Sequence, residues 1–109
     1  GLGDVYKRQP AYYAMIGAGV NWYEAAKDCE LILDHAEELA FVVSNMEDGR
    51  RERYTMPLNE LPKRPNKTTR LHLHLEYDSP KRCQITVEDL GFGEMFPGSG
   101  KVWHETMEG

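Results

Sequence analysis

The feature that most constrains the fold of this chain is a strict alternation of apolar and polar side chains from Leu71 to Tyr77. A repeat of two residues is the period of a β-strand, because successive side chains point to opposite faces of a sheet. The three leucines and the tyrosine are then expected to face a core, and the two histidines and the glutamate to face solvent. The sequence therefore predicts a half-buried strand at this position.

A second alternating run, from Cys83 to Glu88, follows after a short segment of turn-forming residues. Two such runs separated by a few turn residues are typical of an antiparallel hairpin. We expect residues 70–77 to pair with residues 82–89. The second run ends in Glu88, Asp89, Gly91 and Gly93, and the glycines predict a sharp exit from the sheet. The side chains expected in the core are Leu71, Leu73, Leu75, Ile85 and Val87.

Shorter runs on both sides of the hairpin predict further strands. Asp48-Gly49 is a strong turn signal between two of these runs. Pro62 and Pro65 lack the backbone N–H that donates a hydrogen bond to a neighbouring strand, so the segment around them is expected to be a loop. The expected strands are residues 39–43, 54–58 and 102–107. Several short strands with turns between them predict a mainly β fold, a small antiparallel sheet or sandwich.

The N-terminal part of the chain has a different character. Residues 11–26 are rich in Ala, Tyr, Met and Glu and predict one α-helix, with Pro10 in its first turn. Residues 1–9 continue none of the later patterns and resemble a translated adaptor remnant, so we set them aside as foreign. We expect the natural protein to extend upstream of Pro10.

Composition limits the classes of function. The formal net charge is −5, which disfavours a nucleic-acid surface, since phosphate binding needs concentrated positive charge. Lys63, Arg64, Lys67 and Arg70 form a local basic patch that we interpret as a solvated loop. We find no apolar run long enough for a membrane span and no signal peptide, so a cytoplasmic protein without a membrane partner is expected. Cys29 and Cys83 are expected as thiols rather than as a disulfide.

The candidate chemical motifs are incomplete. Residues 98–101 resemble part of a phosphate-binding loop, but Met95 and Val102 stand where that motif needs glycine and Ser or Thr. His72 and His74 share a strand face with a spacing that some metal sites use, yet we identify no third ligand and expect solvated histidines and no metal. Neighbouring strand residues point to opposite faces, so Glu88 and the acid after it cannot flank one substrate atom. We expect no catalytic residues and no enzyme in this chain.

Three parts of the chain, namely a helix, a linker and a set of strands, together resemble one known family. Residues 58–65, 71–78 and 83–93 resemble the later strands of the substrate-binding β-domain of the seventy-kilodalton heat-shock (DnaK-like) chaperones. Glu88, Asp89, Gly91 and Gly93 match the acidic and glycine positions that end a strand in that family. Residues 16–19 resemble a small-residue helix near the end of the actin-like ATPase domain. The run Leu31, Ile32, Leu33, Asp34 resembles the interdomain linker.

This resemblance implies a division of the chain. Residues 10–26 would be a helix from the end of an ATPase domain, residues 27–34 the linker, and residues 35–109 a trimmed substrate-binding β-domain. It also implies a function, namely a regulatory or client-binding module of a bacterial chaperone-like ATPase. The implied partners are a protein or peptide client and the ATPase domain. ATP and Mg²⁺ would bind only in that upstream domain, so no cofactor is expected in this fragment.

Two alternatives stay open at this stage. A stand-alone β-sheet interaction module without nucleotide coupling would hold a partner by an exposed edge or loop. The run Leu31–Leu33 could equally be a short core strand rather than a linker. A linker implies that its side chains are exposed when the upstream domain is missing, so Leu33→Asp would leave stability unchanged, whereas a core strand would not tolerate that charge.

Overall fold

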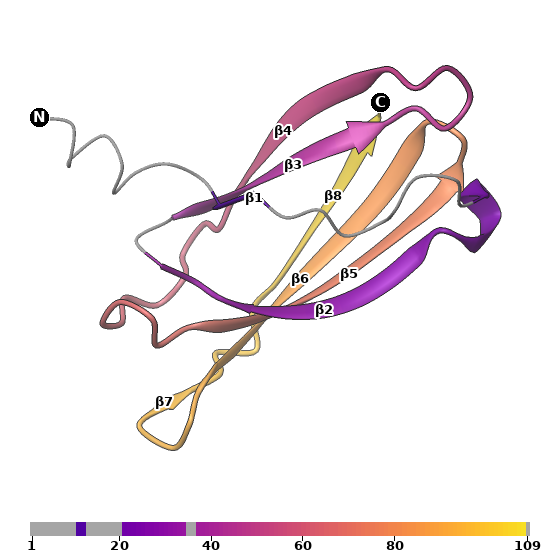
Figure 1. Ribbon diagram of the computed structural model, residues 1–109. Coiled ribbons are helices and arrows are strands. Elements are labelled where there is room, and N and C mark those ends of the chain that lie inside the picture. The colour runs from indigo at the N-terminus through magenta and orange to yellow at the C-terminus, as the bar shows by residue number, and fades with distance from the viewer. Residues whose placement is uncertain (1–10, 13–20, 35–36, 109) are drawn as a thin grey trace, which may run out of the picture.

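The computed structural model describes residues 11–12, 21–34 and 37–108, and these form two β-sheets that pack face to face (Figure 1). The small sheet has the strand order β1-β3-β4, with β1 parallel to β3 and β3 antiparallel to β4. The larger sheet is antiparallel in the order β2-β5-β6, with β8 on the far side of β6 and the short β7 at its end. The elements in chain order are β1 (Ala11–Tyr12), the 3-10 turn η1 (Trp22–Glu24), β2 (Ala26–Ile32), β3 (Glu38–Ser44), β4 (Arg51–Pro57), β5 (Arg70–Ser79), β6 (Arg82–Phe92), β7 (Phe96–Pro97) and β8 (Val102–Glu108).

The core lies between the sheets and is built by the alternating side chains of the predicted hairpin. In the register of β5 and β6, Leu73 lies opposite Val87 and Leu75 opposite Ile85. All five side chains expected in the core are at most 6% exposed, so this prediction is confirmed. The small sheet adds Leu39, Phe41, Val43 and Met56 from β3 and β4. The mainly β, antiparallel fold expected from the sequence is therefore present.

Two hydrogen bonds from aromatic side chains of the larger sheet, one to β3 and one to the loop after β4, close the sides of the sandwich. The Tyr77 hydroxyl donates to the carbonyl oxygen of Ser44 at 2.8 Å, and the Trp103 indole N–H donates to the carbonyl oxygen of Asn59 at 3.0 Å. Each ring also packs against the core, so each joins an apolar contact to a polar one. The predicted last strand is β8, and it brings Trp103 to the side of the core.

The predicted α-helix over residues 11–26 is wrong wherever the structure describes that segment. Residues 11–12 form β1, residues 22–24 form one 3-10 turn, and Ala26 begins β2. Residues 1–10, including Pro10 of the expected first helical turn, and residues 13–20 lie outside the described residues. Helix propensity is a weak local preference, and pairing with a long neighbouring strand can outweigh it.

The described residues contain no helix with the length and apolar character that a membrane crossing requires.

Most of the segment expected as a linker, residues 27–32, belongs to strand β2 of the larger sheet. β2 pairs with β5 along its whole length, from Ala26 opposite Glu76 to Ile32 opposite Arg70. Leu31 and Leu33 are each 7% exposed and belong to the core, whereas Ile32 is 47% exposed on the opposite face. The expectation of three exposed linker side chains is therefore wrong, and the core-strand alternative holds. The sandwich also begins before residue 35, where the β-domain was expected to start.

Substitution on the two faces of this segment tests the assignment. We expect Leu33→Asp to lower the free energy of unfolding by at least about 3 kcal/mol, because it removes buried apolar area and places a charge against the core. Ile32→Asp is the matched control, since its side chain faces outward from the same segment, and its effect should be much smaller. Urea unfolding of both variants measures the difference. Equal midpoints for the two variants would contradict the burial of Leu33.

Candidate functional site

The loop between β4 and β5, residues 58–69, carries the most constrained polar contact of the described chain. Within it, Arg64 turns inward and only 6% of its side chain is exposed, while its partner Asp89 on β6 has 0% of its side chain exposed. Nη1 of Arg64 lies 2.9 Å from Oδ1 of Asp89, and Nη2 lies 2.8 Å from Oδ2. These two parallel contacts are the bidentate geometry in which a guanidinium binds a carboxylate most strongly.

Further hydrogen bonds make this ion pair a junction of four segments. Arg64 also donates to the Thr69 hydroxyl at 3.2 Å and to the Pro97 carbonyl oxygen at 3.0 Å. Asp89 accepts the backbone N–H groups of Gly91 at 3.0 Å and Ser99 at 3.1 Å. The loop, the end of β6, the strand β7 and the connection to β8 are thereby held at one point. Every buried side-chain nitrogen and oxygen in the described part of the chain has a hydrogen-bond partner.

The electrostatics of Asp89 follow from these contacts. Burial on its own would raise the pKa of this carboxyl, because it penalises the charged form. The hydrogen bonds from Arg64, Ser99 and the Gly91 N–H outweigh burial and hold the pKa well below its ordinary value. The carboxylate is therefore charged at neutral pH and works as a fixed structural anion.

The two glycines of the predicted motif, Gly91 and Gly93, have separate conformational roles. Gly91 has φ +66°, and a Cβ atom there would lie 2.1 Å from the carbonyl oxygen of Phe96, so the backbones of β6 and β7 can approach only without a side chain. Gly93 also has φ +66°, but it has open space around it and serves the turn. Glu88 lies on the outer face of the sheet while Asp89 is buried. The expected separation of the two acids onto opposite faces is confirmed.

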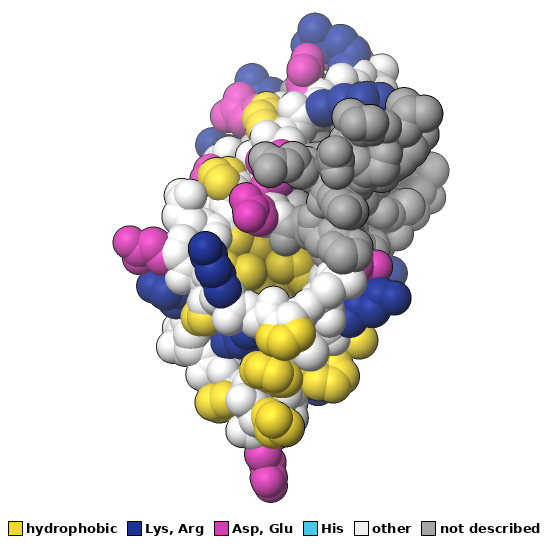
Figure 2. Space-filling model, turned by 90° about the vertical axis from the view of Figure 1, so that its left-hand side faces the viewer, with side chains coloured by type: hydrophobic (Ala, Val, Ile, Leu, Met, Phe, Trp, Pro, Cys, Tyr) yellow, Lys and Arg dark blue, Asp and Glu magenta, His cyan; other side chains and the backbone are white. Residues whose placement is uncertain are grey.

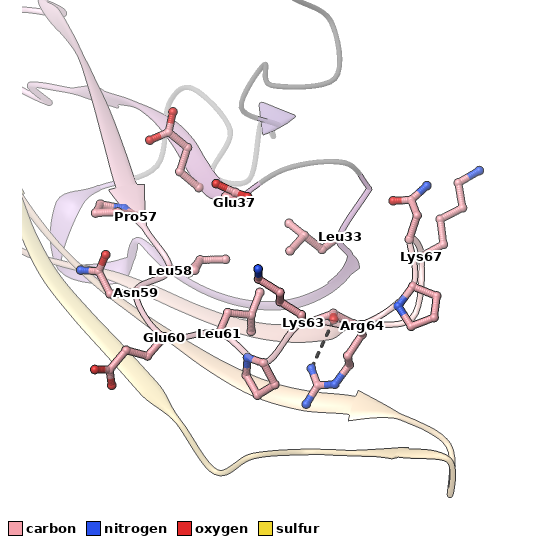
Figure 3. A pocket seen from close by; sticks show the side chains of 15 residues that line it. Leu33, Glu37, Pro57, Leu58, Asn59, Glu60, Leu61, Lys63, Arg64 and Lys67 are labelled. Atoms are coloured by element: carbon pink, nitrogen blue, oxygen red, sulfur yellow. Dashed lines mark hydrogen bonds between the residues drawn. The ribbon is translucent and has the colours of Figure 1, made fainter. Parts of the chain in front are cut away.

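An open groove of about 1060 Å³ lies beside the anchored loop, at the end of the sandwich. We call it the end groove. Figure 2 shows a hollow with hydrophobic side chains on its floor and charged side chains at its margin. In Figure 3, the side chains of Leu33, Leu58 and Leu61 point toward one common space beside the loop. The groove is lined by Leu33, Glu37, Glu38, residues 57–67 and Thr69.

The backbone of the loop is held in an uncommon conformation at both of its ends. Glu60 and Lys67 each have φ +63°, the left-handed region that residues other than glycine rarely adopt. Such conformations persist where the surrounding structure imposes them, and they are concentrated at binding and switching sites. Here Arg64 supplies the anchor between the two positions. The loop, held through Arg64, forms one wall of the groove.

A second polar cluster lies on the outer face of the larger sheet. One oxygen of Asp28, on β2, lies 3.0 Å from Nε2 of His72 and 2.9 Å from Nδ1 of His74. The hydrogen bond with Asp28 raises the pKa of His74 above its ordinary value, and the same contact lowers the pKa of Asp28. Within residues 21–34 and 37–108, no group of three or more His, Cys, Asp or Glu side chains is arranged so that it could hold a metal ion.

Sequence reasoning missed Arg64, which it placed in a solvated basic patch. The patch description holds for Lys63 and Lys67, which are exposed, but the structure corrects it for Arg64. The available signal was Asp89, because an acid at an inward position of an alternating strand needs a cation or several donors. Which of the four basic residues supplies it depends on how the loop folds back, and the local pattern does not contain that information.

The other sequence-predicted residues are spread over the fold. Leu33 lines the groove, while Asp34 lies 3.8 Å from Nζ of Lys67 in an exposed ion pair. Leu31 is in the core and Ile32 is on the outer face. Of the acidic and glycine motif, Asp89 is hydrogen-bonded to a residue that lines the groove, namely Arg64. The structure thus brings Leu33 and Arg64 to one site and leaves Glu88 and Gly93 away from it.

Comparison with known families gives one result. Residues 3–109 match the family described as Domain of unknown function (DUF8552). The chain belongs to this family. The match includes most of the segment that we set aside as foreign, and the structure does not describe that segment. No curated protein and no solved structure matches the chain.

The buried ion pair predicts a large effect of a single substitution. We expect Arg64→Met to lower the free energy of unfolding by about 3–5 kcal/mol, because it leaves the Asp89 charge buried without its cation. Arg82→Met is the control, since Arg82 pairs with Asp78 on the exposed surface, and we expect its stability to be nearly unchanged. Chemical denaturation measures both. Similar losses in the two variants would show that the Arg64 contact is an ordinary surface pair.

The histidine cluster predicts a pH dependence whose sign is set by the two pKa shifts. Because the pKa of His74 is raised on folding, its contact stabilises the fold below the unfolded pKa and is lost as pH rises through the folded value. Because the pKa of Asp28 is lowered on folding, its contact stabilises the fold above the pKa of Asp28 in the unfolded chain. This stabilisation is lost as the pH falls through the pKa of Asp28 in the folded protein. An NMR titration should place the His74 pKa above about 6.5, and Asp28→Asn should lower it. An unchanged His74 pKa in Asp28→Asn would contradict the contact.

Proposed function

We propose that this chain is a non-catalytic, partner-binding β-module that holds an extended peptide segment of another protein in the end groove. The observation that carries the proposal is the groove itself, with its leucine floor, charged rim and anchored loop wall. Peptide sites commonly combine apolar pockets for side chains with polar groups that orient the chain. Loops on a rigid β scaffold are common positions for such sites.

The anchored loop supports binding because it lowers the cost of ordering the site. A wall that must be ordered on binding reduces affinity, whereas a wall already held in the free protein does not. Arg64 and Asp89 hold the loop from behind, so Leu61 and Pro62 are presented toward the groove without a rearrangement. A groove of about 1060 Å³ has room for several residues of an extended chain.

The resemblance to the chaperone β-domain supplies the first candidate for the biological context. In that case the module is the client-contacting or regulatory part of a chaperone-like, actin-fold ATPase. The ATP and Mg²⁺ of such a protein belong to its upstream domain, and the client is a protein or peptide segment.

A second context, a stand-alone interaction module without nucleotide coupling, is favoured by one specific observation. The segment that resembles the interdomain linker begins in strand β2 and continues just past its end, and its two leucines, Leu31 and Leu33, are part of the core. Side chains already buried in the module are not available to dock on a second domain in one nucleotide state and leave it in another. We therefore place peptide binding first and nucleotide coupling second.

A peptide-binding measurement tests the proposal. We expect short apolar peptides from a fluorescent library to bind, and Leu61→Asn to raise the dissociation constant about tenfold or more, because it removes one apolar contact from the floor. Val42→Asn is the control, since Val42 is 47% exposed and does not line the groove. Circular dichroism confirms that both variants are folded. The proposal fails if no peptide binds, or if the two variants weaken binding equally.

A further inference from the structure

The end groove has opposite charges on its two sides. Glu37, directly before β3, and Glu38, the first residue of β3, line the groove, and so does Lys63 on the loop. Figure 3 shows Glu37 and Lys63 on opposite sides of the space that Leu33, Leu58 and Leu61 face. The groove is thus polarised as well as apolar.

The other charges around the groove already have partners. Arg64 is bound by Asp89, Lys67 lies 3.8 Å from Asp34, and Glu60 lies 3.3 Å from Lys101. Lys63, Glu37 and Glu38 take part in none of the ion pairs found among the described residues. Lys63 and Glu37 are exposed and Glu38 is half-buried, so all three can meet charges on a ligand.

We infer that the partner segment is a bipolar peptide, with a short apolar stretch between an acidic residue at one end and a basic residue at the other. Its acid would meet Lys63 and its base would meet Glu37 and Glu38, while its apolar side chains cover the leucine floor. This inference rests on the proposed function and specifies the chemistry of the partner. Charges at the rim of an interface fix register and exclude wrong partners more than they add affinity.

Peptides that differ only in their terminal charges test the inference. Four capped heptapeptides share the middle Ser-Leu-Val-Leu-Ser and carry the end pairs Asp and Lys, Asp and Asp, Lys and Lys, or Ser and Ser. We expect the mixed-charge peptide to bind most tightly, by about twofold to fivefold per matched end at low salt, as for exposed ion pairs. Raising the ionic strength should remove most of the preference and leave the apolar contribution.

Charge reversal of the groove supplies the matched variants. Lys63→Glu should shift the preference from the mixed-charge peptide to the peptide with two Lys ends. The triple variant Lys63→Glu, Glu37→Lys and Glu38→Lys should restore it, because the peptide can then bind with its ends exchanged. Thermal unfolding verifies that each variant is folded, which exposed positions on a rim should allow.

The outcomes separate this inference from the proposed function. Equal binding of all four peptides would overturn the bipolar partner and leave peptide binding in place. A preference that persists unchanged in Lys63→Glu would also overturn it, because the selecting charge would lie elsewhere. Failure of every peptide to bind would overturn both.

Discussion

The architecture of the candidate site depends on one buried ion pair. Taking a guanidinium and a carboxylate out of water is costly, and the cost is offset only where geometry and further hydrogen bonds satisfy both groups. Arg64 and Asp89 meet that condition, with two contacts between them and four more to Thr69, Pro97, Gly91 and Ser99. Because these partners lie on separate segments, the pair fixes the loop against the end of β6, and the loop in turn forms a wall of the end groove.

The ion pair and its surroundings also explain why two of the residues that carry the chaperone resemblance are needed for the fold itself. Asp89 is required as the anion that holds the loop, and Gly91 as the position where β6 and β7 come too close for a side chain. Such requirements arise in any fold that needs this junction, so the motif by itself does not assign a chaperone function. The case for a binding role rests on the groove, whose floor and rim come from other residues.

How much the sequence could predict depended on the range of the interactions involved. The hairpin of β5 and β6, the turn at Gly49 and the strand β8 follow from local alternation and turn chemistry, and all were predicted at nearly the right residues. β2 was not, because only its pairing with β5, some 40 residues further along the chain, makes it a strand. Its short apolar run and the Ala-rich segment before it have no local signal that excludes a linker or a helix.

The candidate site could not be predicted from the sequence either, because it is also formed by residues far apart in the chain. Its floor combines Leu33 with Leu58 and Leu61, which meet only after the sandwich has folded. Arg64 looks like its basic neighbours until the acid at the inward position of β6 is placed beside it. Pro62 and Pro65 did predict a loop, and that loop is the element on which the groove depends.

The most direct test of the account is a map of where a peptide binds. In a backbone amide NMR titration with the mixed-charge heptapeptide, we expect the largest shifts at residues 33–34, 37–38 and 57–69. Residues of β2 and β8, at the edges of the larger sheet, should shift little. Shifts concentrated along β2 or β8 would indicate binding by strand addition at a sheet edge and would contradict the assignment of the end groove as the site.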